Sequence, residues 1–166
     1  MKKLIHPVVY AVLVALISCD QRPKQPEKIN TGNLRPGKHY YMAIFEKDSA
    51  RLTVNVAATG RITGTLLIKY TNTDTVTLKR QPTDGTFVGE FKGDTLRADY
   101  TFNSGPKGKT LYTNPIALLH KGDSMVMGHG RIYDYLGRTY FDDRTPIIYT
   151  KSRFTFLPAD RKKKSM

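Results

Sequence analysis

The thiol of Cys19 has the most distinctive chemistry in this chain of 166 residues, because it is the only cysteine. A thiolate is a strong nucleophile and is readily alkylated. One cysteine cannot form a disulfide within its own chain. Residues 4–17 before it are mostly apolar and residues 20–28 after it are polar and contain proline, so a buried free thiol fits this position poorly. We therefore expect Cys19 to be covalently modified.

The residues before Cys19 have the organisation of a secretory signal peptide. Lys2 and Lys3 form a short positive region, and the apolar residues 4–17 follow. The alternative is an uncleaved signal anchor. It is less favoured because the apolar run is shorter than the roughly 20 residues that span a bilayer.

The last four residues of this region, Leu16-Ile17-Ser18-Cys19, resemble the lipobox of bacterial lipoproteins. That resemblance implies a diacylglycerol thioether on Cys19, cleavage after Ser18 and acylation of the new amino terminus. We expect an exported protein that the lipid on Cys19 anchors in the bacterial cell envelope, with the outer membrane as the expected membrane. Asp20 resembles an inner-membrane retention signal of some Gram-negative bacteria, so the leaflet stays open.

The other motifs that could do chemistry are incomplete. Residues 103–110 end in the Gly-Lys-Thr of a phosphate-binding loop, but the first glycine is missing and the residues that follow cannot begin a helix. The histidines lack metal-binding spacing, although His129 could meet Asp134 or the Asp142-Asp143 pair in space. No serine has the setting of a nucleophile. We predict no catalytic residue, no cofactor and no metal site.

Between residues 39 and 158 the apolar residues recur with a period of two, which is typical of half-buried antiparallel strands. Residues 51–56 alternate in this way, and so do residues 96–102. Short turn-forming sequences interrupt the pattern at Thr59-Gly60, Asn72-Thr73-Asp74, Asp84-Gly85, Gly93-Asp94, Gly122-Asp123 and Leu136-Gly137. The sequence predicts an all-β fold: a single antiparallel meander of about eight to ten strands that forms a small barrel, with a β-sandwich as the alternative.

Composition divides the chain into four parts. We expect a signal peptide over residues 1–18, a lipidated tether over residues 19–38, a barrel domain over residues 39–158 and a basic tail over residues 159–166. The sequences GEFKGDTLRADYTF (89–102) and LLHKGDSMVMGHG (118–130) resemble a pattern of small uncharacterised lipoproteins of Bacteroidetes. That resemblance implies a lipocalin-like or avidin-like barrel and carries no established activity.

Two functions fit these features, and neither is catalytic. The first is a binding module whose barrel holds a small apolar ligand through the inward-facing residues Tyr100, Phe102, Met125, Met127, Phe154 and Phe156. Small barrels can instead be filled by their own side chains. The second is a structural or accessory protein that docks on an envelope complex or an anionic polymer through its surface or through its basic tail, which contains Arg161, Lys162, Lys163 and Lys164. The net charge of +13 favours anionic partners, but an exported lipoprotein rarely meets nucleic acid, so we expect no nucleic-acid partner.

Overall fold

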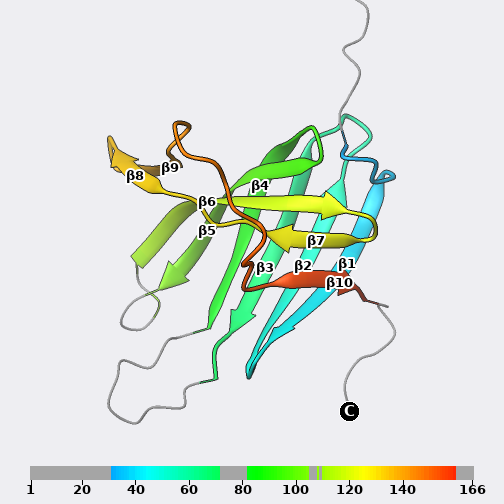
Figure 1. The fold of residues 1–166 in the computed structure, drawn as a ribbon, viewed down its shortest axis with the longest axis horizontal. Coiled ribbons are helices and arrows are strands. Elements are labelled where there is room, and N and C mark those ends of the chain that lie inside the picture. Colours follow the sequence, from blue (N-terminus) through cyan, green and yellow to red (C-terminus); the bar gives the residue numbers. More distant parts are fainter. Residues whose placement is uncertain (1–30, 72–81, 105–107, 109, 160–166) are drawn as a thin grey trace, which may run out of the picture.

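A computed structural model describes residues 31–71, 82–104, 108 and 110–159 of the chain. The all-β prediction is confirmed, because every regular element in this part of the chain longer than a single turn is a strand (Figure 1). The strands are β1 (Gly37–Phe45), β2 (Asp48–Val56), β3 (Ile62–Lys69), β4 (Thr83–Lys92), β5 (Thr95–Ser104), β6 (Thr110–Lys121), β7 (Ser124–Met127), β8 (Ile132–Tyr135), β9 (Arg138–Phe141) and β10 (Thr155–Pro158). Within the described residues, no helix has the length and apolar character needed to cross a membrane.

Eight of these strands close into an antiparallel barrel with the order β1-β10-β7-β6-β5-β4-β3-β2. Strands β1 to β7 form a meander in which each strand pairs with the next. The last strand, β10, pairs with β7 on one side and with β1 on the other. The predicted barrel is therefore confirmed in preference to the sandwich.

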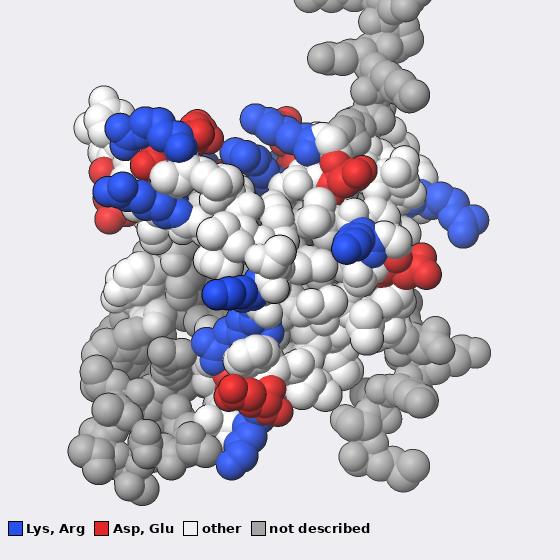
Figure 2. All heavy atoms as spheres, viewed as in Figure 1, with Lys and Arg blue, Asp and Glu red and all other residues white. Residues whose placement is uncertain are grey.

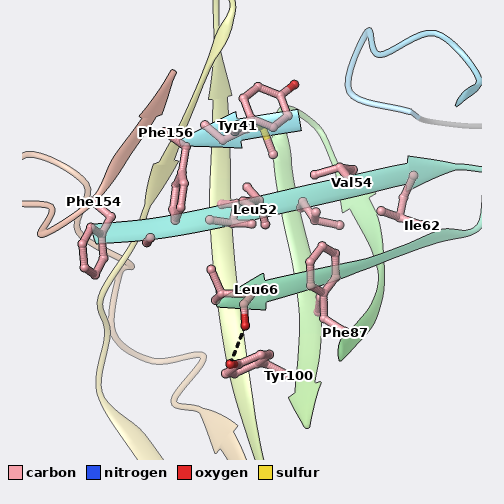
Figure 3. Close-up of a cluster of buried hydrophobic side chains, with 14 of the residues drawn as sticks. Tyr41, Leu52, Val54, Ile62, Leu66, Phe87, Tyr100, Phe154 and Phe156 are labelled. Carbon is pink, nitrogen blue, oxygen red and sulfur yellow. Dashed lines mark hydrogen bonds between the residues drawn. The ribbon is translucent and has the colours of Figure 1, made fainter. Parts of the chain in front are cut away.

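The alternation of residue types puts one face of each strand into the barrel core. In β2, Leu52, Val54 and Val56 are buried, because a strand directs every second side chain to the same face. Figure 3 shows these side chains meeting those of the facing strands, with Phe156 of β10 beside the β2 residues. The core is thus a single cluster enclosed by the eight strands.

Three of the predicted turns are hairpin loops of two residues. Gly93-Asp94 joins β4 to β5, Gly122-Asp123 joins β6 to β7, and Leu136-Gly137 joins β8 to β9. The turn predicted at Asp84-Gly85 is wrong, because both residues lie inside β4. Gly85 serves close packing there: a Cβ atom would collide with the Thr101 carbonyl oxygen on the neighbouring strand. The turn predicted at residues 72–74 lies outside the described residues.

Residues 31–36 cover one end of the barrel, which we name the closed end. Leu34 is buried in the core cluster, and Gly32 lies against the Phe91 ring with a φ of 57°, where a side chain would collide with that ring. The Nδ1 atom of His120 is 2.5 Å from the Gly32 carbonyl oxygen, a hydrogen bond that fixes the segment. The last residues of the expected tether therefore pack on the barrel, and β1 begins at Gly37.

Strands β8 and β9 form a separate two-stranded hairpin beside the barrel. Figure 1 shows this hairpin projecting from the barrel between β7 and β10 in the order of the chain. Residues 142–154, which we name the return segment, lead from the hairpin back to β10. The chain thus leaves the barrel after β7 and re-enters it only with its last strand.

Candidate functional site

A cavity of about 290 Å³ opens at the end of the barrel opposite residues 31–36. We name this end the open end and the cavity the mouth pocket. Strands β3 to β7 supply its barrel wall, and Tyr70 after β3 and residues that follow β7 supply the rest. The lining residues are Leu66, Ile68, Tyr70, Thr83, Tyr100, Phe102, Asn114, Pro115, Ile116, Met127, Gly128, His129, Gly130 and Phe141. Most of them are apolar or aromatic, which is the usual composition of a site for a small molecule.

Stacked aromatic rings form one side of the mouth pocket. The rings of Tyr100 and Phe102 lie 5.0 Å apart between centroids, and those of Phe102 and Tyr112 lie 5.8 Å apart, both nearly parallel. Tyr100 is buried and Tyr112 is exposed, so this row leads from the core to the surface. It offers flat apolar faces to a ligand that enters from solvent.

The phenol of Tyr100 is fixed in position. Its hydroxyl donates a hydrogen bond of 2.8 Å to the Leu66 carbonyl oxygen on β3 (Figure 3). Burial raises the pKa of Tyr100, and the Asp84 carboxylate raises it further, while a hydrogen bond with Thr83 lowers it. The phenol is therefore neutral at pH 7, and this part of the pocket wall is uncharged.

The remaining wall of the mouth pocket comes from the chain around the β8–β9 hairpin. His129 and Ile148 exchange backbone hydrogen bonds of 3.0 and 2.8 Å, which join the residues after β7 to the return segment. A Cβ atom on Gly128 would collide with Ile147 and Tyr149. Glycine at this position therefore lets the return segment pack closely against the pocket wall.

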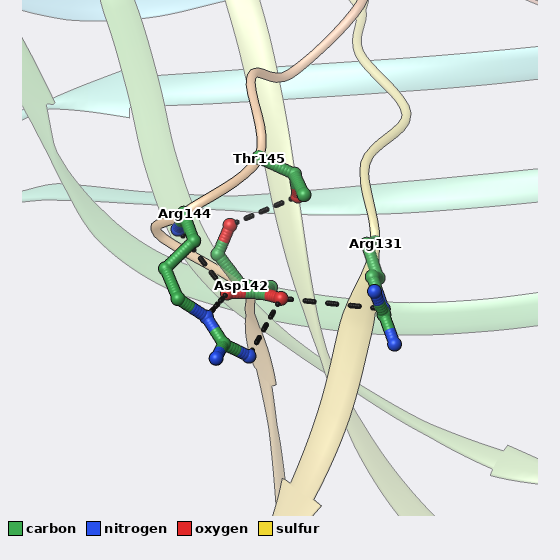
Figure 4. A network of polar contacts seen from close by, with 4 residues as sticks. All are labelled: Arg131, Asp142, Arg144 and Thr145. Atoms are coloured by element: carbon green, nitrogen blue, oxygen red, sulfur yellow. Dashed lines mark hydrogen bonds and ion pairs between the residues drawn. The ribbon is translucent and has the colours of Figure 1, made fainter.

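A buried carboxylate holds the start of the return segment (Figure 4). Asp142 accepts hydrogen bonds from Nε (2.9 Å) and Nη2 (3.1 Å) of Arg144, and its carbonyl oxygen accepts one from the Thr145 hydroxyl (3.1 Å). Nε of Arg131 lies 4.0 Å from the same carboxylate. The side-chain hydrogen bonds from Arg144 are the main cause of a lowered pKa of Asp142. The two charged arginines thus keep Asp142 ionised, and the network fixes the start of the return segment directly after Phe141, which lines the pocket.

A second ion pair lies beside the mouth pocket. Arg153 of the return segment pairs with Asp48 at the start of β2, and Asp48 also accepts a hydrogen bond of 2.8 Å from the Thr71 backbone. The Arg153 guanidinium lies 5.2 Å from the centre of the Tyr70 ring and 5.6 Å from that of Phe154. Because Tyr70 lines the pocket, this cluster fixes one of its walls.

The structure separates the six residues that the sequence assigns to ligand binding into two groups. Tyr100, Phe102 and Met127 line the mouth pocket. Met125, Phe154 and Phe156 are buried in the packed core with almost no exposed surface. The alternation of residue types identified inward-facing positions, but it could not distinguish a wall of the pocket from a side chain that fills the barrel.

Sequence reasoning missed several residues of the pocket, and some of them carried a signal. Leu66 and Ile68 alternate on β3 in the same way as the residues that were chosen. Phe141 and Gly130 carried no such signal, because they belong to segments outside the barrel that reach the pocket only in the folded chain. Contacts of that kind depend on tertiary structure.

The other residues that the sequence analysis singled out form no further site within the described part of the chain. Cys19 and residues 161–164 lie outside the described residues. His129 lines the mouth pocket, and no group of three or more His, Cys, Asp or Glu side chains in the described part of the chain could hold a metal ion. Thr110 begins β6, so a strand stands where a phosphate-binding loop would open a helix.

Comparison with known proteins gives no further assignment. No protein-family model, no curated protein and no solved structure matches the chain. The physical properties of the mouth pocket and the sequence around Cys19 are therefore the basis for assigning a function.

Proposed function

We propose that the protein is a lipoprotein of the bacterial cell envelope that binds a small apolar molecule in the mouth pocket and does not catalyse a reaction. The observation that carries this proposal is the mouth pocket itself, a cavity of about 290 Å³ with a mostly apolar lining and a stacked row of aromatic rings. An apolar molecule that enters it removes its own surface and that of the rings from water, at about 25 cal/mol per Å².

The lining also contains a few polar groups that can orient a ligand. Asn114, His129 and Thr83 lie among the apolar residues of the pocket. An amide and an imidazole can both donate and accept hydrogen bonds. The preferred ligand is therefore an apolar molecule with one or a few polar groups, small enough for the cavity.

The anchor and the location rest on the sequence. Leu16-Ile17-Ser18-Cys19 resembles a lipobox, and the strand and turn sequences resemble those of small lipoproteins of Bacteroidetes. A single acyl chain holds a protein only marginally on a membrane, whereas two or three hold it stably. We propose the outer membrane as the anchoring membrane.

Mass spectrometry of the protein extracted gently from its host's membranes tests both parts of the proposal. The denatured mass is expected to match an acylated chain that begins at Cys19. The native mass is expected to exceed it by one discrete small molecule. A full-length unmodified chain contradicts the anchor, and a native mass equal to the denatured mass contradicts the ligand.

A pair of matched variants locates the ligand. Met127→Trp places a large ring in the mouth pocket and is expected to abolish the bound mass, because Met127 lines the cavity. Met42→Trp makes the same change at an exposed position of β1 and is expected to retain it. Circular dichroism of both variants checks that the barrel is intact. Retention of the ligand by Met127→Trp would place its site elsewhere.

A further inference from the structure

The loop of the β8–β9 hairpin and the residues beside it form an exposed apolar surface. Leu136 is 88% exposed and Tyr135 62%, and about half of Tyr133, on the same face of β8 as Tyr135, is also exposed. We name these three residues the hairpin tip. Exposed apolar residues that occur singly are ordinary, but a group of three on one projecting element is typical of an interaction surface.

The backbone at Leu136 adds a second observation. Leu136 has a φ of 50° in a loop of two residues, and Gly137 after it has a φ of 75°. Positive φ at both loop positions favours asparagine, aspartate or glycine, whereas a bulky side chain is strained there. Such strain is characteristic of functional positions. The strained backbone holds a leucine side chain in solvent at the outermost point of the hairpin.

Contacts with the barrel hold the hairpin in place. Arg138 of β9 pairs with Asp99 of β5, and Arg97 of β5 pairs with Asp143 just after β9 at 3.4 Å. The rings of Tyr133 and Tyr140 stack across the two strands at 5.8 Å. The hairpin tip is therefore presented in a fixed orientation, directed away from the barrel.

The position of the hairpin tip relative to the start of the described chain indicates what it contacts. In the view of Figure 1, the hairpin and residues 31–36 both lie along the upper edge of the molecule, whereas β10 lies below them. Residues 20–30 connect that edge to Cys19, and even fully extended they reach only about 40 Å. An anchor at Cys19 thus keeps the barrel close enough to the membrane for the hairpin tip to reach it.

We propose that the hairpin tip inserts into the lipid bilayer that holds the acylated Cys19, an inference that rests on the proposed anchor. Leu136 enters the acyl region, and Tyr135 and Tyr133 lie at the level of the headgroups, where amphipathic rings are enriched. Asp134 between the tyrosines accepts a hydrogen bond of 2.6 Å from the Thr139 hydroxyl. The barrel is therefore held against the membrane at two points.

Two properties of the chain favour this contact. Cleavage after Ser18 removes Lys2 and Lys3 and no acidic residue, so the side-chain charge falls only from +13 to +11, and it attracts the protein to anionic headgroups. The short tether makes insertion an intramolecular event with a high effective concentration, so a small apolar surface is sufficient. A hairpin tip that binds bilayers weakly by itself becomes membrane-inserted when the anchor is present. Figure 2 shows white atoms at the upper left, where the hairpin lies, with blue and red groups among them.

The chain contains no tryptophan, so one introduced residue reports its own surroundings. Leu136→Trp is made in the full-length protein, which is purified from its host and reconstituted in vesicles of phosphatidylethanolamine and phosphatidylglycerol. Its emission is expected to shift to shorter wavelength, and brominated acyl chains are expected to quench it by more than half. Ile44→Trp on β1 is the matched control, because Ile44 is 72% exposed and lies close to the open end. Its emission is expected to remain that of a residue in water.

Each outcome of this experiment has one meaning. Intact mass, measured on the same sample, shows whether Cys19 is acylated and so tests the anchor separately from the hairpin tip. An acylated protein in which Leu136→Trp is not quenched by brominated lipid overturns the insertion. So does emission that changes with protein concentration instead of lipid, because a second copy of the chain then covers the hairpin tip.

Discussion

The two ends of the barrel are made by the same eight strands but are covered in different ways. At the closed end, two-residue loops join β4 to β5 and β6 to β7, and residues 31–36 place Leu34 in the core. At the open end only β1 and β2 are joined by a two-residue loop, residues 70–82 and 105–109 form longer connections, and the return segment lies beside a cavity. This difference shows that the strands enclose the barrel interior, whereas the segments outside the strands determine which end of the interior stays open.

The largest expected difference between the two ends is in the cost of removing a phenylalanine. Phe156→Ala removes a fully buried ring from the packed half of the barrel and is expected to reduce the free energy of unfolding by about 4 kcal/mol. Phe102→Ala removes a partly buried ring beside the mouth pocket and is expected to cost only about 1–2 kcal/mol, because this ring already borders open space. Urea denaturation measures both values. Equal losses of unfolding free energy in the two variants would contradict the distinction between a packed part of the barrel interior and a part that borders the mouth pocket.

The cover of the closed end is the next feature to test. Leu34→Ala is expected to cost about 2 kcal/mol, at the lower end of the range for buried leucines, because Leu34 closes the core from one side only. Hydrogen exchange is expected to become faster at residues 31–36 and at the β6–β7 loop, which His120 connects to Gly32. Unchanged exchange at these sites would show that residues 31–36 do not close this end.

The smallest expected effect concerns pH and the wall of the open end. The hydrogen bonds from Arg144 lower the pKa of Asp142 in the folded protein, so the stabilisation by Asp142 is complete above its unfolded pKa of about 3.9. It is lost as the pH falls through the lower folded pKa. The difference in unfolding free energy between the wild type and Asp142→Asn is therefore expected to be constant from about pH 7 to pH 5 and to shrink below about pH 4.

Asp143→Asn is the matched control for this measurement. Its carboxylate is 85% exposed and pairs with Arg97 at 3.4 Å, so its removal is expected to change stability little at any pH. If Asp143→Asn showed the same acid-dependent difference as Asp142→Asn, the Arg144 network would not be its cause.

Much of the fold could be predicted from the sequence, because a period of two in apolar residues is a local signal. Residues 51–56 alternate and form most of β2, and Gly93-Asp94 and Gly122-Asp123 are the hairpin loops that their types indicate. Asp84-Gly85 has the same composition as those loops but lies in β4. A glycine is needed there because a Cβ atom would collide with the Thr101 carbonyl oxygen and the Tyr100 ring on β5. Turn chemistry alone cannot detect that requirement.

The candidate site was predictable only in part, for a related reason. Alternation correctly placed Tyr100 and Phe156 on the inner face, yet Tyr100 lines a cavity and Phe156 is packed on all sides. Which of these two environments an inward residue has depends on the segments that close each end. Leu34, a single apolar residue in a polar stretch, gives no periodic signal of its role at the closed end.

The place of β10 has a consequence for the order of folding. β10 pairs with both β1 and β7, and its partners in β1 are Tyr41 and Met42, near the opposite end of the described chain. Until residues 155–158 have been synthesised, β1 and β7 each present an unpaired edge, and such edges are prone to associate with other chains. Closure also brings together residues far apart in sequence, which makes it entropically costly and slow. The barrel is therefore closed only by its last described strand, and a chain that stops before β10 leaves unpaired the edges of β1 and β7 that β10 covers in the complete barrel.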